Sequence, residues 1–137
     1  MSLKEDQSTA GVFADQAIKE EVAIQDRMWG DTNERADASH NQLLHAAIAQ
    51  LDLLNFKLEG YPDAVELARV VYPKDWDGFR DYGSNVANLV VAAAFIRSEI
   101  KRRVALGEDT ERSQRGKPYT KAKPYVSSDV ASDELYK

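Results

Sequence analysis

Residues Val86–Ile96 read VANLVVAAAFI and are followed directly by RSEIKRR at residues 97–103. Asn88 is the single polar residue of the first stretch, so a helix here would be apolar around its whole circumference. Such a helix is surrounded by protein, either at the centre of a bundle or in the seam of an oligomer. The stretch is too short to cross a bilayer. We therefore expect a helical bundle, a homo-oligomer, and no membrane segment.

Apolar residues recur at steps of three and four along the rest of the chain, which predicts an all-α fold of about four helices. The first helix is expected from about Phe13 to Trp29, and Gly30 is expected to end it. Its predicted core stripe is Ile18, Val22 and Trp29, with Ala17, Ile24 and Met28 beside it.

The second helix is expected from Asn41 to Glu59. Ser39 and Gln42 have the spacing of a capping box at its start, and Gly60 follows its end. The apolar residues at helical spacing predict its core face as Leu43, Leu44, Ala47, Ile48, Leu51, Leu54 and Leu58.

A short third helix is expected between Pro62 and Pro73, with Val65, Ala68 and Val71 facing inward. The fourth is expected to be the longest and central helix, beginning near Asp81 or Ser84 and ending at Leu106. Its predicted core stripe is Leu89, Ala93, Ile96, Ile100 and Val104.

This reading divides the chain into a lead at residues 1–12, a helical bundle at 13–107 and an extended C-terminal arm at 108–137. The arm repeats Lys-Pro-Tyr at residues 117–119 and 123–125, and proline keeps the residue before it extended. We expect Tyr119 and Tyr125 to anchor the arm on its own body or on a neighbouring subunit.

Composition excludes several chemistries. The chain has no cysteine, which removes disulfides, thiolate metal sites and cysteine nucleophiles. The net charge of −5 argues against broad binding to nucleic acid. No charged-then-apolar leader is visible at the N-terminus, so we expect a cytoplasmic protein of a bacterial host.

The segment Tyr72–Tyr82, YPKDWDGFRDY, combines four aromatic residues with an arginine and three aspartates. This composition is typical of recognition surfaces, and it equally suits a lid that closes the end of a bundle. The candidate binding residues in it are Trp76, Phe79, Arg80, Asp81 and Tyr82.

His40 and His45 complete the set of candidate binding residues. They are five positions apart, so they point in different directions on a helix and cannot share a metal ion as residues at i and i+4 would. His45 and Asp52 do share a face, which suits a polar flank on a structural or solvent-lining histidine.

Carboxylates on different helices could also meet at a metal ion, since bundles bind divalent cations through acids on facing helices. Glu21, Asp81 and Glu99 are the residues that such a site would use. Glu99 has a competing explanation, because Arg102 and Arg103 lie three and four residues after it and would form helix-surface ion pairs.

Residues 20–30, EEVAIQDRMWG, resemble the opening of small helical proteins encoded by phages and prophages. Leu43–Ala47 and the stretch from Leu89 to Ile100 are similar to the same pattern, so the resemblance covers roughly residues 15–105. Some of these proteins are distantly similar to MazG-type all-α nucleotide pyrophosphohydrolases. That family implies Mg²⁺ held by Glu-Glu-x-x-Glu on one helix and Glu-x-x-Asp on another. This chain departs from the pattern, because residues 46–52 read AAIAQLD and the last helix offers only Glu99.

The leading hypothesis is a phage-type accessory protein, an oligomeric helical module that binds a host protein or a small, nucleotide-like ligand without catalysis and without a cofactor. One alternative is a divergent Mg²⁺-dependent nucleotide pyrophosphohydrolase that uses Glu21, Asp81 and Glu99. Another is a component of the virion or of its assembly.

Overall fold

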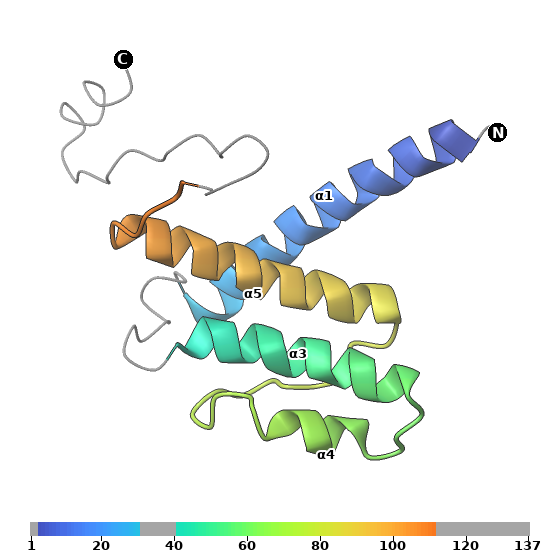
Figure 1. Cartoon of the computed structure of the whole chain (residues 1–137), viewed down its shortest axis with the longest axis vertical. Helices are drawn as coiled ribbons and strands as arrows, with labels where there is room; N and C mark the ends of the chain where they lie inside the picture. The colour runs from blue at the N-terminus through green and yellow to red at the C-terminus, as the bar shows by residue number, and fades with distance from the viewer. Residues whose placement is uncertain (1–2, 31–40, 112–137) are drawn as a thin grey trace. The chain divides into compact units, whose positions relative to one another are not determined.

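A computed structural model describes residues 3–30 and 41–111. This part of the chain contains four helices and no strand, which confirms the all-α prediction. The helices are α1 (Leu3–Trp29), α3 (Gln42–Leu58), α4 (Ala64–Arg69) and α5 (Asn85–Ala105) (Figure 1). The chain divides into two compact units, Met1–Ser98 and Glu99–Lys137, with the division inside α5. None of the helices in the described ranges combines the length and apolarity needed to cross a membrane.

Helix α1 begins at Leu3 rather than near Phe13, so most of the predicted lead is helical. Residues 3–12 have few apolar side chains, and without an apolar stripe the sequence carries no signal for this start. Residues 7–16 are all exposed. With 27 residues α1 is longer than α5, which has 21, so the prediction that the last helix is the longest is wrong. Gly30 follows α1 with a φ of 80°, as expected for a residue that ends a helix.

Helix α3 begins at Gln42. Asn41 before it has left-handed backbone angles, and Ser39 of the predicted capping box lies outside the described residues. Leu43 and Ala47 of the predicted core face are buried, and Leu54 is half-buried. The prediction is wrong for the other members of that face, which are exposed: Leu44, Ile48, Leu51 and Leu58. Their places in the core are taken by residues on the opposite side of α3, namely Ala46, Ala49, Gln50 and Leu53.

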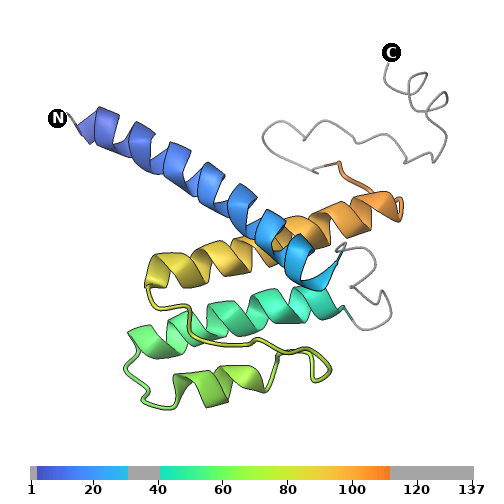
Figure 2. The same ribbon diagram turned by 180° about the vertical axis from the view of Figure 1, so that it is seen from behind.

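The core of the first unit forms between α3, α4 and residues 85–98 of α5. Helix α4 packs against α3, and its Ala64 and Ala68 are buried where the two helices meet. Figures 1 and 2 show α3 between α4 and α5, with the segment between α4 and α5 running along one side of α3. That segment adds Tyr72 and Phe79 to the core.

Within the part of the chain that the structure describes, residues 85–98 of α5 are buried on one side only. Val91 and Phe95 are 3% and 2% exposed, as expected for the apolar stretch. The predicted stripe, in contrast, lies outside this core: Leu89, Ile96 and Ile100 are exposed, and Ala93 and Val104 are half-buried. The prediction therefore chose the wrong face of α5, because Val91 and Phe95 on its other side pack into the core.

A buried amide pair joins α3 to α5. Asn88 is 0% exposed and Gln50 is 1% exposed. The Nε2 of Gln50 donates to Oδ1 of Asn88 at 2.9 Å and to the carbonyl of Arg80 at 3.1 Å. The backbone N–H of Tyr82 donates to the same Oδ1 at 2.9 Å. The one polar residue of the apolar stretch is thus the point where two helices and the segment before α5 are held together.

Replacing Asn88 by Ala leaves the Gln50 amide and the Tyr82 N–H without their acceptor in a buried site. We expect Asn88→Ala to lower the free energy of unfolding by about 2–4 kcal/mol, measured by urea denaturation. Asn85→Ala, an exposed asparagine on the same helix, should change it by less than about 0.5 kcal/mol. Equal effects of the two substitutions would contradict this role of Asn88.

Candidate interaction site

The aromatic residues of the segment Tyr72–Tyr82 form one cluster with the core. The ring centroids of Tyr72 and Phe79 are 4.9 Å apart, and Trp76 lies 6.2 Å from Tyr72 and 6.4 Å from Phe95 of α5. Tyr72 and Phe79 are each 6% exposed. This packing is what the lid interpretation of the segment requires, and it also holds the exposed residues between the rings in place.

Two tyrosines form hydrogen bonds to backbone carbonyls within the same segment. The hydroxyl of Tyr72 donates to the carbonyl of Asp77 at 3.1 Å, and that of Tyr82 donates to the carbonyl of Gly78 at 3.2 Å. Gly78 has a φ of 90°, and a Cβ built there would lie 3.4 Å from Cζ2 of Trp29 at the end of α1. A side chain at this position would therefore be strained, so the turn depends on glycine.

Arginines lie over two of these rings. The guanidinium of Arg69 is 5.5 Å from the centroid of Phe79, and that of Arg80 is 5.6 Å from the centroid of Tyr82. Both distances are within the range of a cation–π interaction. Arg80 is exposed, so this predicted binding residue presents a charge at the surface while its ring partner is half-buried.

Two open hollows lie on either side of Val70–Lys74. The first, which we call the Trp76 hollow, has a volume of about 480 Å³ and is lined by Glu66, Arg69, Val70, Tyr72, Pro73, Lys74 and Trp76. The second has about 490 Å³ and is lined by Gln42, His45, Val70, Val71, Tyr72, Pro73, Lys74 and Asp75. They share Val70, Tyr72, Pro73 and Lys74, so together they form one indented surface.

The predicted binding residues are distributed over several places. Trp76 and His45 line the two hollows just described. Tyr82 lines a third hollow of about 340 Å³ between α1 and α5, which also contains Glu21. Phe79 is buried in the core, and His40 lies outside the described residues.

The sequence reading missed Val70, which is 79% exposed although it is aliphatic. Val70 follows the last residue of α4, and a short helix with a mixed pattern carries no clear signal for which of its terminal residues face water. Arg69, the last residue of α4, was missed for the same reason, whereas Lys74 lies in the segment Tyr72–Tyr82 but was not selected as a binding residue.

Asp81 is fixed by three partners. Lys57 of α3 forms an ion pair with Oδ2 at 2.6 Å, and Oδ1 accepts hydrogen bonds from Asn88 at 3.0 Å and from the N–H of Gly83 at 2.9 Å. These contacts, led by the hydrogen bond from Lys57, lower the pKa of Asp81 to about 2. The carboxylate therefore serves to attach the start of α5 to α3.

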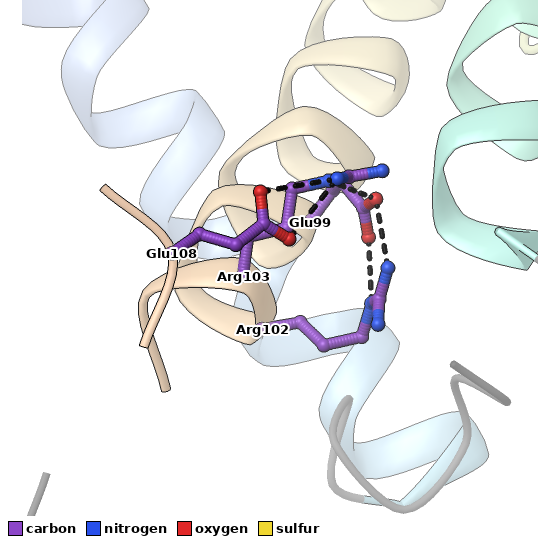
Figure 3. Close-up of polar contacts among 4 residues, drawn as sticks. All are labelled: Glu99, Arg102, Arg103 and Glu108. Atoms are coloured by element: carbon purple, nitrogen blue, oxygen red, sulfur yellow. Dashed lines mark hydrogen bonds and ion pairs between the residues drawn. The ribbon is translucent and has the colours of Figure 1, made fainter. Parts of the chain in front are cut away.

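Glu99 is held within its own helix. Burial by itself raises the pKa of Glu99, but hydrogen bonds from Arg102 and Arg103 outweigh burial and leave the pKa below its ordinary value. Arg102 binds both carboxylate oxygens, with its Nε 2.8 Å from Oε1 and its Nη2 3.0 Å from Oε2. The Nε of Arg103 lies 2.8 Å from Oε2, and its Nη1 continues to Glu108 (Figure 3). The ion pairs predicted from the spacing are present, but Glu99 and Arg102 are each 6% exposed, so the prediction that the pairs lie on the helix surface is wrong for these two residues.

Glu21 differs from the other two acids. Burial raises the pKa of Glu21, and a hydrogen bond from Nε2 of Gln25 at 3.1 Å lowers it in part. Within residues 3–30 and 41–111, no three His, Asp or Glu side chains are grouped so that they could hold a metal ion. The three acids that the Mg²⁺ alternative needs are each engaged by neighbours of their own.

Comparison of this chain with protein-family models, with curated proteins and with solved structures produced no match. The resemblance to phage-encoded helical proteins and to MazG-type enzymes therefore stays a prediction from sequence.

The pKa of Asp81 makes a prediction about acid stability. Because folding lowers this pKa from 3.8 to about 2, its contribution is present above pH 3.8 and is lost as the pH falls through about 2. Asp81→Asn should lower the free energy of unfolding at neutral pH by less than about 1 kcal/mol, since the ion pair is partly exposed. The difference between the two proteins should disappear near pH 2 in urea titrations. A difference that stays constant with pH would show that the charge of Asp81 is irrelevant.

Proposed function

We propose that this chain is a non-catalytic helical binding module, a phage-type accessory protein that engages a protein of the bacterial host. The observation that carries the proposal is the Trp76 hollow. It has an apolar surface made by Val70, Pro73 and Trp76, and two cations, Arg69 and Lys74, at its edge. Aromatic and arginine side chains at an indented surface are typical of the energetic centres of protein interfaces.

Rigidity of the surrounding segment supports the same proposal. The rings of Tyr72 and Phe79 are buried, and the tyrosine hydroxyls bind backbone carbonyls within the segment. A binding surface that is ordered before its partner arrives loses less conformational entropy on association. Val70 lies exposed beside this ordered segment, where an apolar side chain of the partner can cover it.

The engaged carboxylates favour binding over hydrolysis. Asp81 pairs with Lys57, and Glu99 pairs with Arg102 and Arg103. A Mg²⁺ ligand at either place would first have to give up these partners. The pyrophosphohydrolase alternative, with Mg²⁺ on Glu21, Asp81 and Glu99, and the virion or assembly alternative stay predictions, and no observation on the structure favours them.

The test uses a displayed library of random peptides selected on the full chain. We expect enriched peptides with an apolar anchor whose affinity falls by about tenfold, or about 1.4 kcal/mol, in Val70→Asp. Leu67→Asp is the matched control, because Leu67 is 38% exposed on the same short helix but does not line either hollow beside Val70. Its affinity should be unchanged.

Two results would contradict the proposal. The first is enrichment of peptides that bind both variants equally well. The second is release of pyrophosphate from any nucleotide with Mg²⁺, accompanied by a large rise in melting temperature with that nucleotide.

A further inference from the structure

Helices α3 and α5 each carry an apolar stripe that is exposed among the residues that the structure describes. On α3 the stripe consists of Leu44, Ile48, Leu51 and Leu58, which are 36%, 37%, 40% and 68% exposed. On α5 it consists of Val86, Leu89 and Ile96, which are 53%, 46% and 40% exposed. Within each stripe the residues follow one another at steps of three, four or seven, which is the spacing of seams between packed helices.

The two stripes lie on the same side of the first unit. Gln50 and Asn88 mark where α3 and α5 face each other, since their side chains are hydrogen-bonded. Leu51 and Leu89 each follow one residue later, a turn of about 100° around the helix axis. Because the two helices run in opposite directions (Figures 1 and 2), equal turns bring both stripes to one side. We call this surface the α3–α5 face.

No residue at the stripe positions themselves is charged; exposed Arg97, four residues after Ala93, and half-buried Asp52, four residues after Ile48, border the α3–α5 face. The other residues at stripe positions are Asn55 and Ala93. The exposed surface of α1 differs, because it includes Asp15, Lys19 and Glu20. Charged residues are depleted at the core of protein interfaces and abundant on surfaces that meet only water. The absence of charge at the stripe positions supports coverage of the α3–α5 face by another protein.

The shape and size of the face suit a second copy of this chain. Its large side chains expose on the order of 600 Å² per copy, close to the roughly 800 Å² per partner of a standard interface. A pair of antiparallel helices with regular apolar spacing is complementary to another such pair, and the two pairs together form a four-helix bundle. Sequence periodicity selected all of these residues except Val86 as core, which is what a core shared between two chains would produce.

We propose that the α3–α5 face is the interface of a homodimer, in which α3 and α5 of two copies pack as a four-helix bundle. The proposal is independent of the Trp76 hollow, whose residues belong to α4 and the segment that follows it. Coverage of the face by residues 112–137 of the same chain, or by a different protein, is a competing outcome that the experiments below separate.

The first experiment measures the mass of the full chain by sedimentation equilibrium. We expect about twice the chain mass of 15.3 kDa for the wild type and a single chain mass for the double variant Leu51→Glu, Leu89→Glu. Both residues are exposed in one copy, so the helical circular dichroism should be unchanged. Leu67→Glu, with a similar exposure on α4, is the control and should stay dimeric. A monomeric wild type, or a double variant that stays dimeric, overturns the proposal.

A second experiment guards against loss of the dimer through misfolding. The oppositely charged variant Leu51→Lys, Leu89→Lys should also be monomeric alone. Mixing the Glu and Lys variants should restore a species of two chain masses, since opposite charges then meet across the interface. Failure to associate on mixing, with both variants folded, would contradict a self-complementary α3–α5 face.

Discussion

The hydrogen bond between Gln50 and Asn88 is the constraint on which the first unit depends. A buried amide is costly unless its donors and acceptors are satisfied, and here the partners of Gln50 and Asn88 come from α3, α5 and the segment before α5. Asn88 accepts from Gln50 and Tyr82 and donates to Asp81, which in turn binds Lys57. The pair therefore determines the register of α3 against α5, and through Tyr82 it positions the end of the aromatic segment.

Much of the fold could be predicted from the sequence, because the local spacing of apolar residues indicates where helices form. Gly30 ended its helix as expected, with positive φ. The spacing of apolar residues cannot decide which of two apolar faces of a helix is buried within the same chain. In α3 and α5 both faces are apolar, and the small residues Ala46 and Ala49 allow the close approach that determines the inner one. The exposed face carries the larger apolar residues, and these dominated the spacing pattern. The prediction therefore assigned that face to the core.

The candidate site was predictable only where its contacts are local. Glu99 and its arginines lie within about one helical turn of each other, so their spacing in the sequence was sufficient to predict the ion pairs. The attachment of Asp81 to Lys57, and of Asn88 to Gln50, joins residues far apart in the chain, and no local pattern indicates it. The segment Tyr72–Tyr82 was recognised by composition, but composition does not separate rings that enter the core from those that line a hollow. Trp76 does both, because it packs against Phe95 of the core and lines the Trp76 hollow.

The most direct test of this account is hydrogen exchange at the backbone N–H of Tyr82, followed by NMR. This N–H lies outside any helix and donates to the buried Oδ1 of Asn88. If the amide pair holds the unit together, its exchange should be as slow as that of the N–H groups in the middle of α3, because it opens only when the unit unfolds. Exchange as fast as that of the exposed loop residues, with α3 still protected, would contradict the account.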